Sequence, residues 1–374
     1  MNNRNMSTTT SFIITGISDE PLMQFFVFLL ILLIYLITLG GNISIFLLVC
    51  LDHHLHTPMY FFLANLSILD ISCSTITLQK IIFSFKSGDH SVPILECFVQ
   101  IFVFLGFTAD ELLVLTAMSY DRYVAICNPL RYHLVMNFKL CSLLVFLCWL
   151  FGFLESIPTF VGIYKITCFK SFKMDHFFCD IMPVLKLSCS DTSFLQLYIL
   201  TVGWFLTGFT PFALTFISYI FIIGTILSIH SSKGRRKAFY TCSSHLTVVI
   251  CLYVSLVLQY LRPTSSINLG SNKYFSLFNA AAVPILNPLI YSLKNKDVKA
   301  SLKPTISCNK RKIIKQPHPY LSMAPAWVSR LQSPGSSLQA PAPGSRLLLG
   351  SPGSSFQAPA LGSRLLLGSP GFGL

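Results

Sequence analysis

The sequence has 374 residues, of which 53% are hydrophobic and only 11% are charged, with a formal net charge of +13. Soluble domains carry about 25% charged residues. The composition therefore excludes an ordinary water-soluble protein and makes a membrane the natural solvent for this chain. The 12 cysteines include no CxxC pair, which argues against zinc ribbons and thioredoxin-like sites.

Residues 1–24 are predicted to form a polar tail outside the cell. Asn5 begins an Asn-Met-Ser sequence, which is an acceptor for N-glycosylation. The apolar run that follows is too long for the core of a cleavable signal peptide. We therefore expect this run to stay in the protein as a signal anchor.

Seven apolar runs follow along the chain, and each can supply the about 20 residues that a helix needs to cross a bilayer. They are Phe25–Leu51, Pro58–Gln79, Cys97–Tyr120, Leu140–Gly162, Thr192–Ile229, Ala238–Leu261 and Tyr274–Leu293. Because the runs are continuous rather than alternating, helices are favoured over the strands of a membrane barrel. The predicted fold is an all-α integral membrane protein, a seven-transmembrane helix bundle over 25–303 that ends in a short amphipathic eighth helix.

Positive charge is concentrated in one set of the predicted loops. These residues are Arg122, Arg131, Lys139, Lys233, Arg235, Arg236, Lys237, Lys294, Lys296, Lys299 and Lys303. The other loops mix both signs. Cytoplasmic loops are enriched in lysine and arginine, so the N-terminus is predicted to lie outside and the C-terminus in the cytoplasm. Since the positive charge belongs beside a membrane, no nucleic-acid partner is expected.

The segment 304–374 has a different composition. It begins basic and becomes rich in Pro, Gly, Ser and Ala, and ten residues from Ser333 nearly repeat from Ser351. Such a sequence cannot bury a core. We expect a low-complexity, disordered cytoplasmic tail.

Four motifs mark the runs. They are Leu55-His-Thr-Pro-Met-Tyr-Phe-Phe-Leu-Ala-Asn-Leu-Ser-Ile-Leu-Asp70, Met118-Ser-Tyr-Asp-Arg-Tyr-Val-Ala-Ile-Cys127, Lys237-Ala-Phe-Tyr-Thr-Cys-Ser-Ser-His-Leu-Thr-Val-Val249 and Pro284-Ile-Leu-Asn-Pro-Leu-Ile-Tyr291. Together they resemble the vertebrate odorant (olfactory) receptors, which are rhodopsin-like, class A G-protein-coupled receptors. The resemblance covers roughly residues 5–303. It departs at Tyr240, where the family usually has Ser.

The resemblance implies a plasma-membrane receptor rather than an enzyme. It would bind a small volatile odorant, activate a heterotrimeric G protein of the olfactory stimulatory type, and raise cyclic AMP. The implied switch residues are Asp121, Arg122, Tyr123, Tyr219, Asn287, Pro288 and Tyr291. An arginine at the end of a helix can exchange partners when neighbouring helices move, and Pro288 removes a backbone hydrogen bond and creates a hinge.

Acidic residues inside membrane runs are expensive and are functional candidates. The resemblance groups Asp70, Glu111 and Asn287 into a buried polar cluster. Two states of this cluster remain open: a sodium ion held at Asp70 and Glu111, or a hydrogen-bonded carboxyl pair without an ion. Asp110 has no role in this interpretation.

Four cysteines, Cys97, Cys168, Cys179 and Cys189, fall in the predicted outer loops or at the outer end of a span, and four cysteines allow three pairings. The resemblance selects Cys97–Cys179, which is common to the superfamily, and Cys168–Cys189, which is the odorant-receptor addition. Such bonds form in the oxidising secretory pathway.

The resemblance also places a ligand pocket among the outer halves of the third, fifth, sixth and seventh helices. Candidate lining residues are Phe104, Leu105, Thr108, Gly203, Thr207, Tyr253, Leu256, Val257, Tyr260 and Leu277. For each of them, helix packing explains the residue equally well. Amine receptors carry Asp where Phe104 stands and opsins carry Lys where Ala281 stands, so neither amine recognition by that acid nor retinal attachment is expected.

The sequence also bears on two other classes of membrane protein. A transporter would show inverted repeats and broken helices, and the runs have no such symmetry. A membrane enzyme would need a motif such as HExxH or GxSxG within a span, and none is present. Both alternatives are disfavoured.

Overall fold

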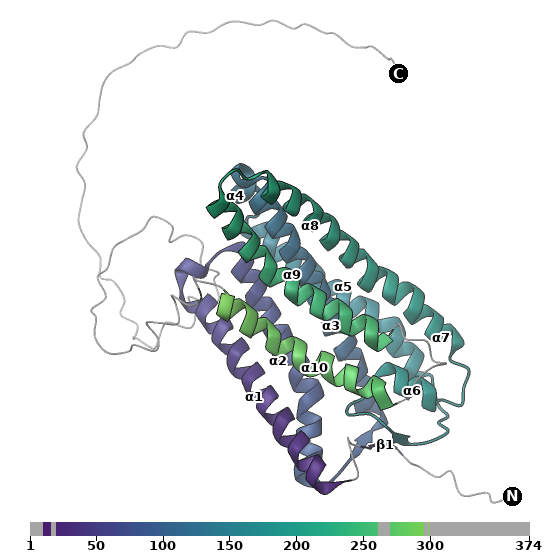
Figure 1. Ribbon diagram of the computed structural model, residues 1–374. Coiled ribbons are helices and arrows are strands. Elements are labelled where there is room, and N and C mark those ends of the chain that lie inside the picture. The colour runs from purple at the N-terminus through teal and green to yellow at the C-terminus, as the bar shows by residue number, and fades with distance from the viewer. Residues whose placement is uncertain (1–9, 16–19, 261–269, 295–297, 299–374) are drawn as a thin grey trace, which may run out of the picture. The chain divides into compact units, whose positions relative to one another are not determined.

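The computed structural model of the chain describes residues 10–15, 20–260, 270–294 and 298. Long helices packed side by side dominate this part of the chain (Figure 1). Six of them are long and apolar enough to cross a membrane, and a shorter apolar helical stretch covers Tyr274–Ile290. The predicted all-α bundle of seven helices is confirmed.

The bundle is built from seven helical spans. They are α1 (Pro21–Leu51), α2 (Pro58–Ser87), α3 (Ile94–Cys127), α5 (Phe138–Tyr164), the continuous series α7 (Ser193–Tyr198), η3 (Ile199–Phe209) and α8 (Thr210–Ser228), then α9 (Ser232–Tyr260) and α10 (Gly270–Lys294). Short helices occupy the connections: η1 (His53–Leu55), η2 (Pro129–Arg131), α4 (Tyr132–Val135) and α6 (Ile181–Leu187). The expected glycosylation site Asn5, the predicted tail 304–374 and, apart from Val298, the predicted eighth helix lie outside the described residues.

Several helix ends follow from local sequence. Pro21 and Pro58 stand in the first turns of α1 and α2, where a missing N–H costs nothing and the fixed φ suits a helix. The Asn137 side chain caps α5 by accepting a hydrogen bond from Leu140 N at 2.9 Å. Gly88 ends α2 at a φ of 68°, a left-handed conformation that glycine adopts without a Cβ clash.

The fifth span contains an unexpected π-helical segment. Residues Ile199–Phe209, which form η3, have this wider winding over 11 residues. π-Helical turns are rare and frequently lie at functional sites. Gly203 and Gly208 fall within the segment, and Pro211 follows it in the first turn of α8.

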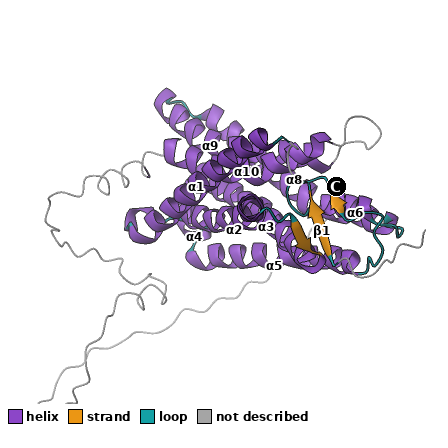
Figure 2. Ribbon diagram, turned by 90° about the horizontal axis from the view of Figure 1, so that it is seen from below, coloured by secondary structure: helices purple, strands orange, loops and turns teal. Residues whose placement is uncertain are grey.

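Three short strands lie together at one end of the bundle, near α6 (Figure 2). Strand β1 (Ser11–Ile14) pairs antiparallel with β2 (Ser91–Pro93) and parallel with β3 (Lys173–Met174). Phe12 of β1 is fully buried in the cluster that includes Cys97 and Cys179. The N-terminal segment is therefore anchored to two loops, which the apolar runs alone did not indicate.

Helices α2 and α3 are the most enclosed of the membrane-length helices that the structure describes. Buried residues occur along α3 from Cys97 to Val124, and it packs against α2, α5 and α8. Helix α1 is the opposite case, since it exposes large apolar side chains such as Phe26, Leu30 and Leu33. An apolar surface of this kind is stable in contact with lipid tails rather than water.

Helices α1 and α10 approach closely at a proline. Pro288 has no N–H to donate to the Pro284 carbonyl one turn earlier, which leaves that carbonyl without its helical partner. The Asn42 amide of α1 donates to this carbonyl at 3.1 Å. The Pro288 ring lies beside Gly41, where an added Cβ would come within 2.8 Å of the proline Cβ. The weak point of α10 is thus supported by α1.

Replacing Gly41 with Val should therefore destabilise the protein, because the new side chain would clash with Pro288. Overpacking of this kind costs about 1–3 kcal/mol. Thermal unfolding of the purified protein in detergent measures the effect. Gly40→Val is the matched control, because a Cβ at Gly40 meets nothing within 4 Å. Equal melting temperatures for the two variants would contradict the close α1–α10 contact.

Candidate functional site

Two disulfides hold the long loop after α5 against the strand end of the bundle. Cys97 in the first turn of α3 is bonded to Cys179, and Cys168 is bonded to Cys189, with Cα–Cα distances of 5.4 and 5.5 Å. These are the two pairings that the resemblance selects. Gln100 adds to the first link, because its side-chain Oε1 accepts a hydrogen bond from Cys179 N at 3.1 Å.

Asp180, which follows the disulfide-bonded Cys179, begins a buried network that joins the loop to two helices. Its Oδ2 accepts hydrogen bonds from Gln259 of α9 and Ser276 of α10, each at 3.1 Å. Asn279 donates to Gln259 Oε1 at 3.2 Å and accepts from Ser255 at 3.1 Å. The loop, α9 and α10 are thereby held in one arrangement.

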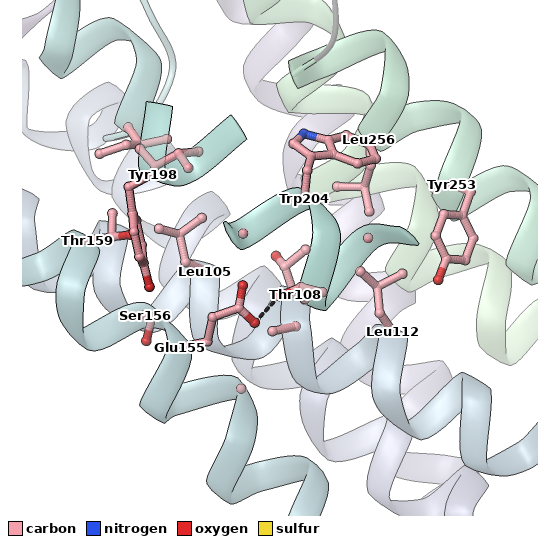
Figure 3. Close-up of a pocket in the computed structure, with 17 residues that line it drawn as sticks. Leu105, Thr108, Leu112, Glu155, Ser156, Thr159, Tyr198, Trp204, Tyr253 and Leu256 are labelled. Carbon is pink, nitrogen blue, oxygen red and sulfur yellow. Dashed lines mark hydrogen bonds between the residues drawn. The ribbon is translucent and has the colours of Figure 1, made fainter. Parts of the chain in front are cut away.

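A cavity of about 120 Å³ lies between α3, α5, η3 and α9 (Figure 3). Its lining comprises Leu105, Thr108, Ala109, Leu112, Gly152, Glu155, Ser156, Thr159, Ile181, Tyr198, Ile199, Gly203, Trp204, Thr207, Gly208, Tyr253 and Leu256. Six of the residues predicted for the pocket lie here: Leu105, Thr108, Gly203, Thr207, Tyr253 and Leu256.

Three other predicted pocket residues lie elsewhere in the structure. Phe104 points toward the opposite side of α3 and packs on Phe178, with ring centroids 5.4 Å apart. Leu277 packs in the same cluster, and Val257 faces outward with 41% of its surface exposed. The Tyr260 side chain lies outside the described residues. The cavity is therefore displaced from α10 toward α5.

The α5 wall of the cavity was not predicted from the sequence. It supplies Glu155, Ser156 and Thr159, and Glu155 accepts a hydrogen bond from the Thr207 hydroxyl of η3. Glu155 is the one acidic residue in the fourth apolar run, and the cost of burying an acid in a membrane is the signal that could have identified it.

The middle of the bundle contains the polar cluster. The Asn287 amide donates to both oxygens of Asp70, at 3.0 and 2.9 Å. Glu111 lies close enough to both residues to interact with them, and its Oε1 is buried without a hydrogen-bond partner among the described residues. The structure therefore brings Asp70, Glu111 and Asn287 together.

At the end of α3 opposite the strands, Arg122 is ion-paired with its neighbour Asp121. Asp121 is fully buried, and its Oδ1 accepts a hydrogen bond from the Tyr132 hydroxyl of α4 at 2.8 Å. Burial and the nearby Asp121 carboxylate raise the pKa of the Tyr132 phenol, which keeps it a donor. Arg122 is thus restrained through Asp121 by the connection between α3 and α5.

His245 of α9 links three helices near this end. Its Nε2 donates to the Leu115 carbonyl of α3 at 3.0 Å, since a carbonyl can only accept. Nδ1 is then an acceptor, and the Tyr219 hydroxyl of α8 lies 2.8 Å away as the donor. Tyr123 packs against the cluster that contains Tyr219. The side chain of Tyr291 lies outside the described residues.

Comparisons with known proteins show which sequences this chain resembles. The family model described as olfactory receptor matches residues 31–310. Human olfactory receptor 6C1 is 43% identical over 296 residues, which cover 79% of this chain and 95% of that protein. Human olfactory receptor 8D1 is 42% identical over 81% of this chain and 98% of its own length. Mouse olfactory receptor 5AR1 is 40% identical over 82% and 98%.

Replacing Asp180 with Ala should destabilise the strand end of the bundle. The substitution leaves the buried Gln259 and Ser276 groups without their acceptor, which costs about 1–3 kcal/mol. We expect a lower melting temperature of the purified protein and less of it at the cell surface. Asp175→Ala, which alters an exposed acid in the same loop, is the control. The network has no structural importance if both variants melt alike.

Proposed function

The chain belongs to the olfactory receptor family, and on this premise we propose that it binds small volatile odorants in the η3 cavity and activates a heterotrimeric G protein of the olfactory stimulatory type, raising cyclic AMP. It is a multi-pass membrane protein of a receptor family and not an enzyme. The observation that carries the proposal is that α3 lines the cavity with Leu105 and Thr108 and carries Arg122 near its other end.

The proposed location is the plasma membrane, with the N-terminus outside. The disulfide bonds lie at the strand end of the bundle, which fits the oxidising side of a secretory membrane. Arg122, Arg131 and Lys139 belong to the opposite end, which fits the cytoplasmic preference of basic residues. The G protein would therefore meet the end that carries Arg122.

The cavity favours a small ligand. An engineered apolar cavity of about 150 Å³ binds benzene, so a cavity of about 120 Å³ suits a molecule of comparable size or smaller. Leucine, isoleucine and aromatic side chains supply dispersion contacts, and Thr108, Ser156 and Thr159 supply hydroxyl groups. This composition suits a volatile compound with one or two polar atoms.

Activation would require the cavity ligand to stabilise a state in which α9 has moved. A ligand shifts a conformational equilibrium only through different affinities for the two states. Tyr253 and Leu256 place α9 in the cavity wall, and His245 joins the same helix to α3 and α8. Movement of α9 would break the His245 bonds and open a cleft beside Arg122, which would then leave Asp121.

The polar cluster fits a sodium ion. Sodium prefers oxygen ligands, as other hard cations do. Asp70 and Glu111 supply carboxylate oxygens, and the buried Glu111 Oε1 and Asn287 Oδ1 have no hydrogen-bond partners among the described residues. We propose that Asp70 and Glu111 would hold the ion, whose charge would offset the two neighbouring acids in the resting arrangement.

Arg122→Ala tests the proposed G-protein coupling. The variant should lose most ligand-induced cyclic AMP, because the cationic group that leaves Asp121 for the G-protein cleft is removed. Cells that express the chain are challenged with a broad volatile panel while surface receptor is measured by antibody. Ligand binding, followed as a thermal shift, should persist because Arg122 is remote from the cavity. Full signalling by the variant at equal surface levels would refute the role of Arg122.

His245→Leu should raise cyclic AMP in the absence of ligand. The change removes two buried hydrogen bonds that hold α9 against α3 and α8, and each is worth about 0.5–1.5 kcal/mol. Together the two bonds contribute about 1–3 kcal/mol, so we expect basal signalling to rise about fivefold or more. His230→Leu, at an exposed position in the connection from α8 to α9, is the control. Unchanged basal signalling in His245→Leu would contradict its role as a restraint.

A further inference from the structure

We propose that the cavity recognises small primary amines, with the Glu155 carboxylate of α5 pairing with the ligand's ammonium group. The inference rests on the proposed function, because it specifies the ligand class of the same cavity. It goes further by assigning recognition to a helix that was not expected to line the pocket.

Glu155 is the one charged side chain among the cavity-lining residues, which include no Lys, Arg or His. Its Oε2 accepts a hydrogen bond from Thr207. Its Oε1 makes no hydrogen bond to any residue that the structure describes. Figure 3 shows the carboxyl group reaching from α5 toward the η3 segment, where the dashed bond ends. One carboxyl oxygen is therefore available to a ligand.

Gly203 leaves open space beside Glu155 Oε1, because it has no side chain. A Cβ at Gly203 would meet just one atom within 4 Å, Glu155 Oε1 at 3.7 Å. The π-helical winding of η3 brings Gly203, Trp204, Thr207 and Gly208 to the same cavity. A small cationic head group can approach the carboxylate here without displacing a side chain.

A second acid lies behind the same wall. Asp110 of α3 is fully buried, and neither of its carboxyl oxygens has a hydrogen-bond partner among the described residues. Its carboxyl group occupies the space that a side chain at Gly152 would take, and Gly152 lines the cavity. An unpaired acid is costly to ionise in a low-dielectric site. A ligand ammonium group in the cavity would place a positive charge near both Asp110 and Glu155.

Aromatic rings complete the recognition of a cation. Tyr198, Trp204 and Tyr253 all line the cavity, and an ammonium group is attracted to the face of such rings. The position where amine receptors carry an acid is occupied by Phe104, which packs on Phe178 away from the cavity. Amine binding would thus use α5 instead of the outer part of α3.

The test compares compounds of nearly equal shape: isoamylamine, isoamyl alcohol and isohexane. Each has about six non-hydrogen atoms, as benzene has. Binding is measured on the full chain in lipid nanodiscs as a ligand-induced rise in melting temperature, and cyclic AMP is measured separately in cells. We expect isoamylamine to bind about tenfold or more tightly than isoamyl alcohol, since charge-assisted hydrogen bonds are stronger than neutral ones.

Glu155→Gln keeps the side-chain shape and removes the charge. It should weaken isoamylamine about tenfold or more while leaving isoamyl alcohol nearly unchanged. Thr207→Val removes the neighbouring hydroxyl but keeps the acid, so the preference for the amine should persist. Glu96→Gln is the matched control, because Glu96 is an exposed acid paired with Lys80 outside this cavity.

Two results would overturn the inference: no preference for the amine in the wild-type protein, or an equal loss of amine and alcohol binding in Glu155→Gln. The proposed function fails separately. Amine binding that depends on Glu155 but never raises cyclic AMP would support the ligand class and contradict the coupling. Cyclic AMP responses to neutral volatiles without amine preference would support the coupling and contradict the amine ligand class.

Discussion

Helix α3 is enclosed by protein along its length, and the polar groups of the bundle depend on it. Lipid offers no hydrogen-bond partners, so a polar side chain in a membrane is stabilised by partners within the protein. Along α3 these partners form a series. Near the strand end, α3 carries the disulfide of Cys97 and then the cavity residue Thr108. Further along, it carries Glu111 of the polar cluster and the Leu115 carbonyl that accepts a hydrogen bond from His245. Arg122 lies near the opposite end.

In this arrangement α3 stays in place and α9 is the helix that can move. Apolar contacts between helices give little preference for one position over another in lipid, and hydrogen bonds at close range supply it. Helix α9 is attached to the rest by a few such bonds, through Gln259 to Asp180 and through His245 to Leu115 and Tyr219. A ligand between these attachments, beside Tyr253 and Leu256, acts on the same helix.

Much of the fold follows from sequence because a bilayer fixes the length and polarity of a span, and continuous apolar runs reveal both. The disulfide pairing came from the family resemblance. The Asp180 network could not be predicted, since Asp180 lies 79 residues from Gln259 and 96 from Ser276. Neither could η3, because π and α windings place similar apolar residues in the same run. The cavity, which Glu155 and η3 both line, could not be placed for the same reason.

The account depends on α9 moving away from α3 when ligand and G protein bind. The most direct measurement is the distance between spin labels placed through unnatural amino acids at Leu134 of α4 and Phe239 of α9, both exposed near the Arg122 end. The distance should be narrowly distributed in the resting protein, and it should lengthen with an activating ligand and G protein. An unchanged distance under conditions that raise cyclic AMP would contradict the movement of α9 away from α3.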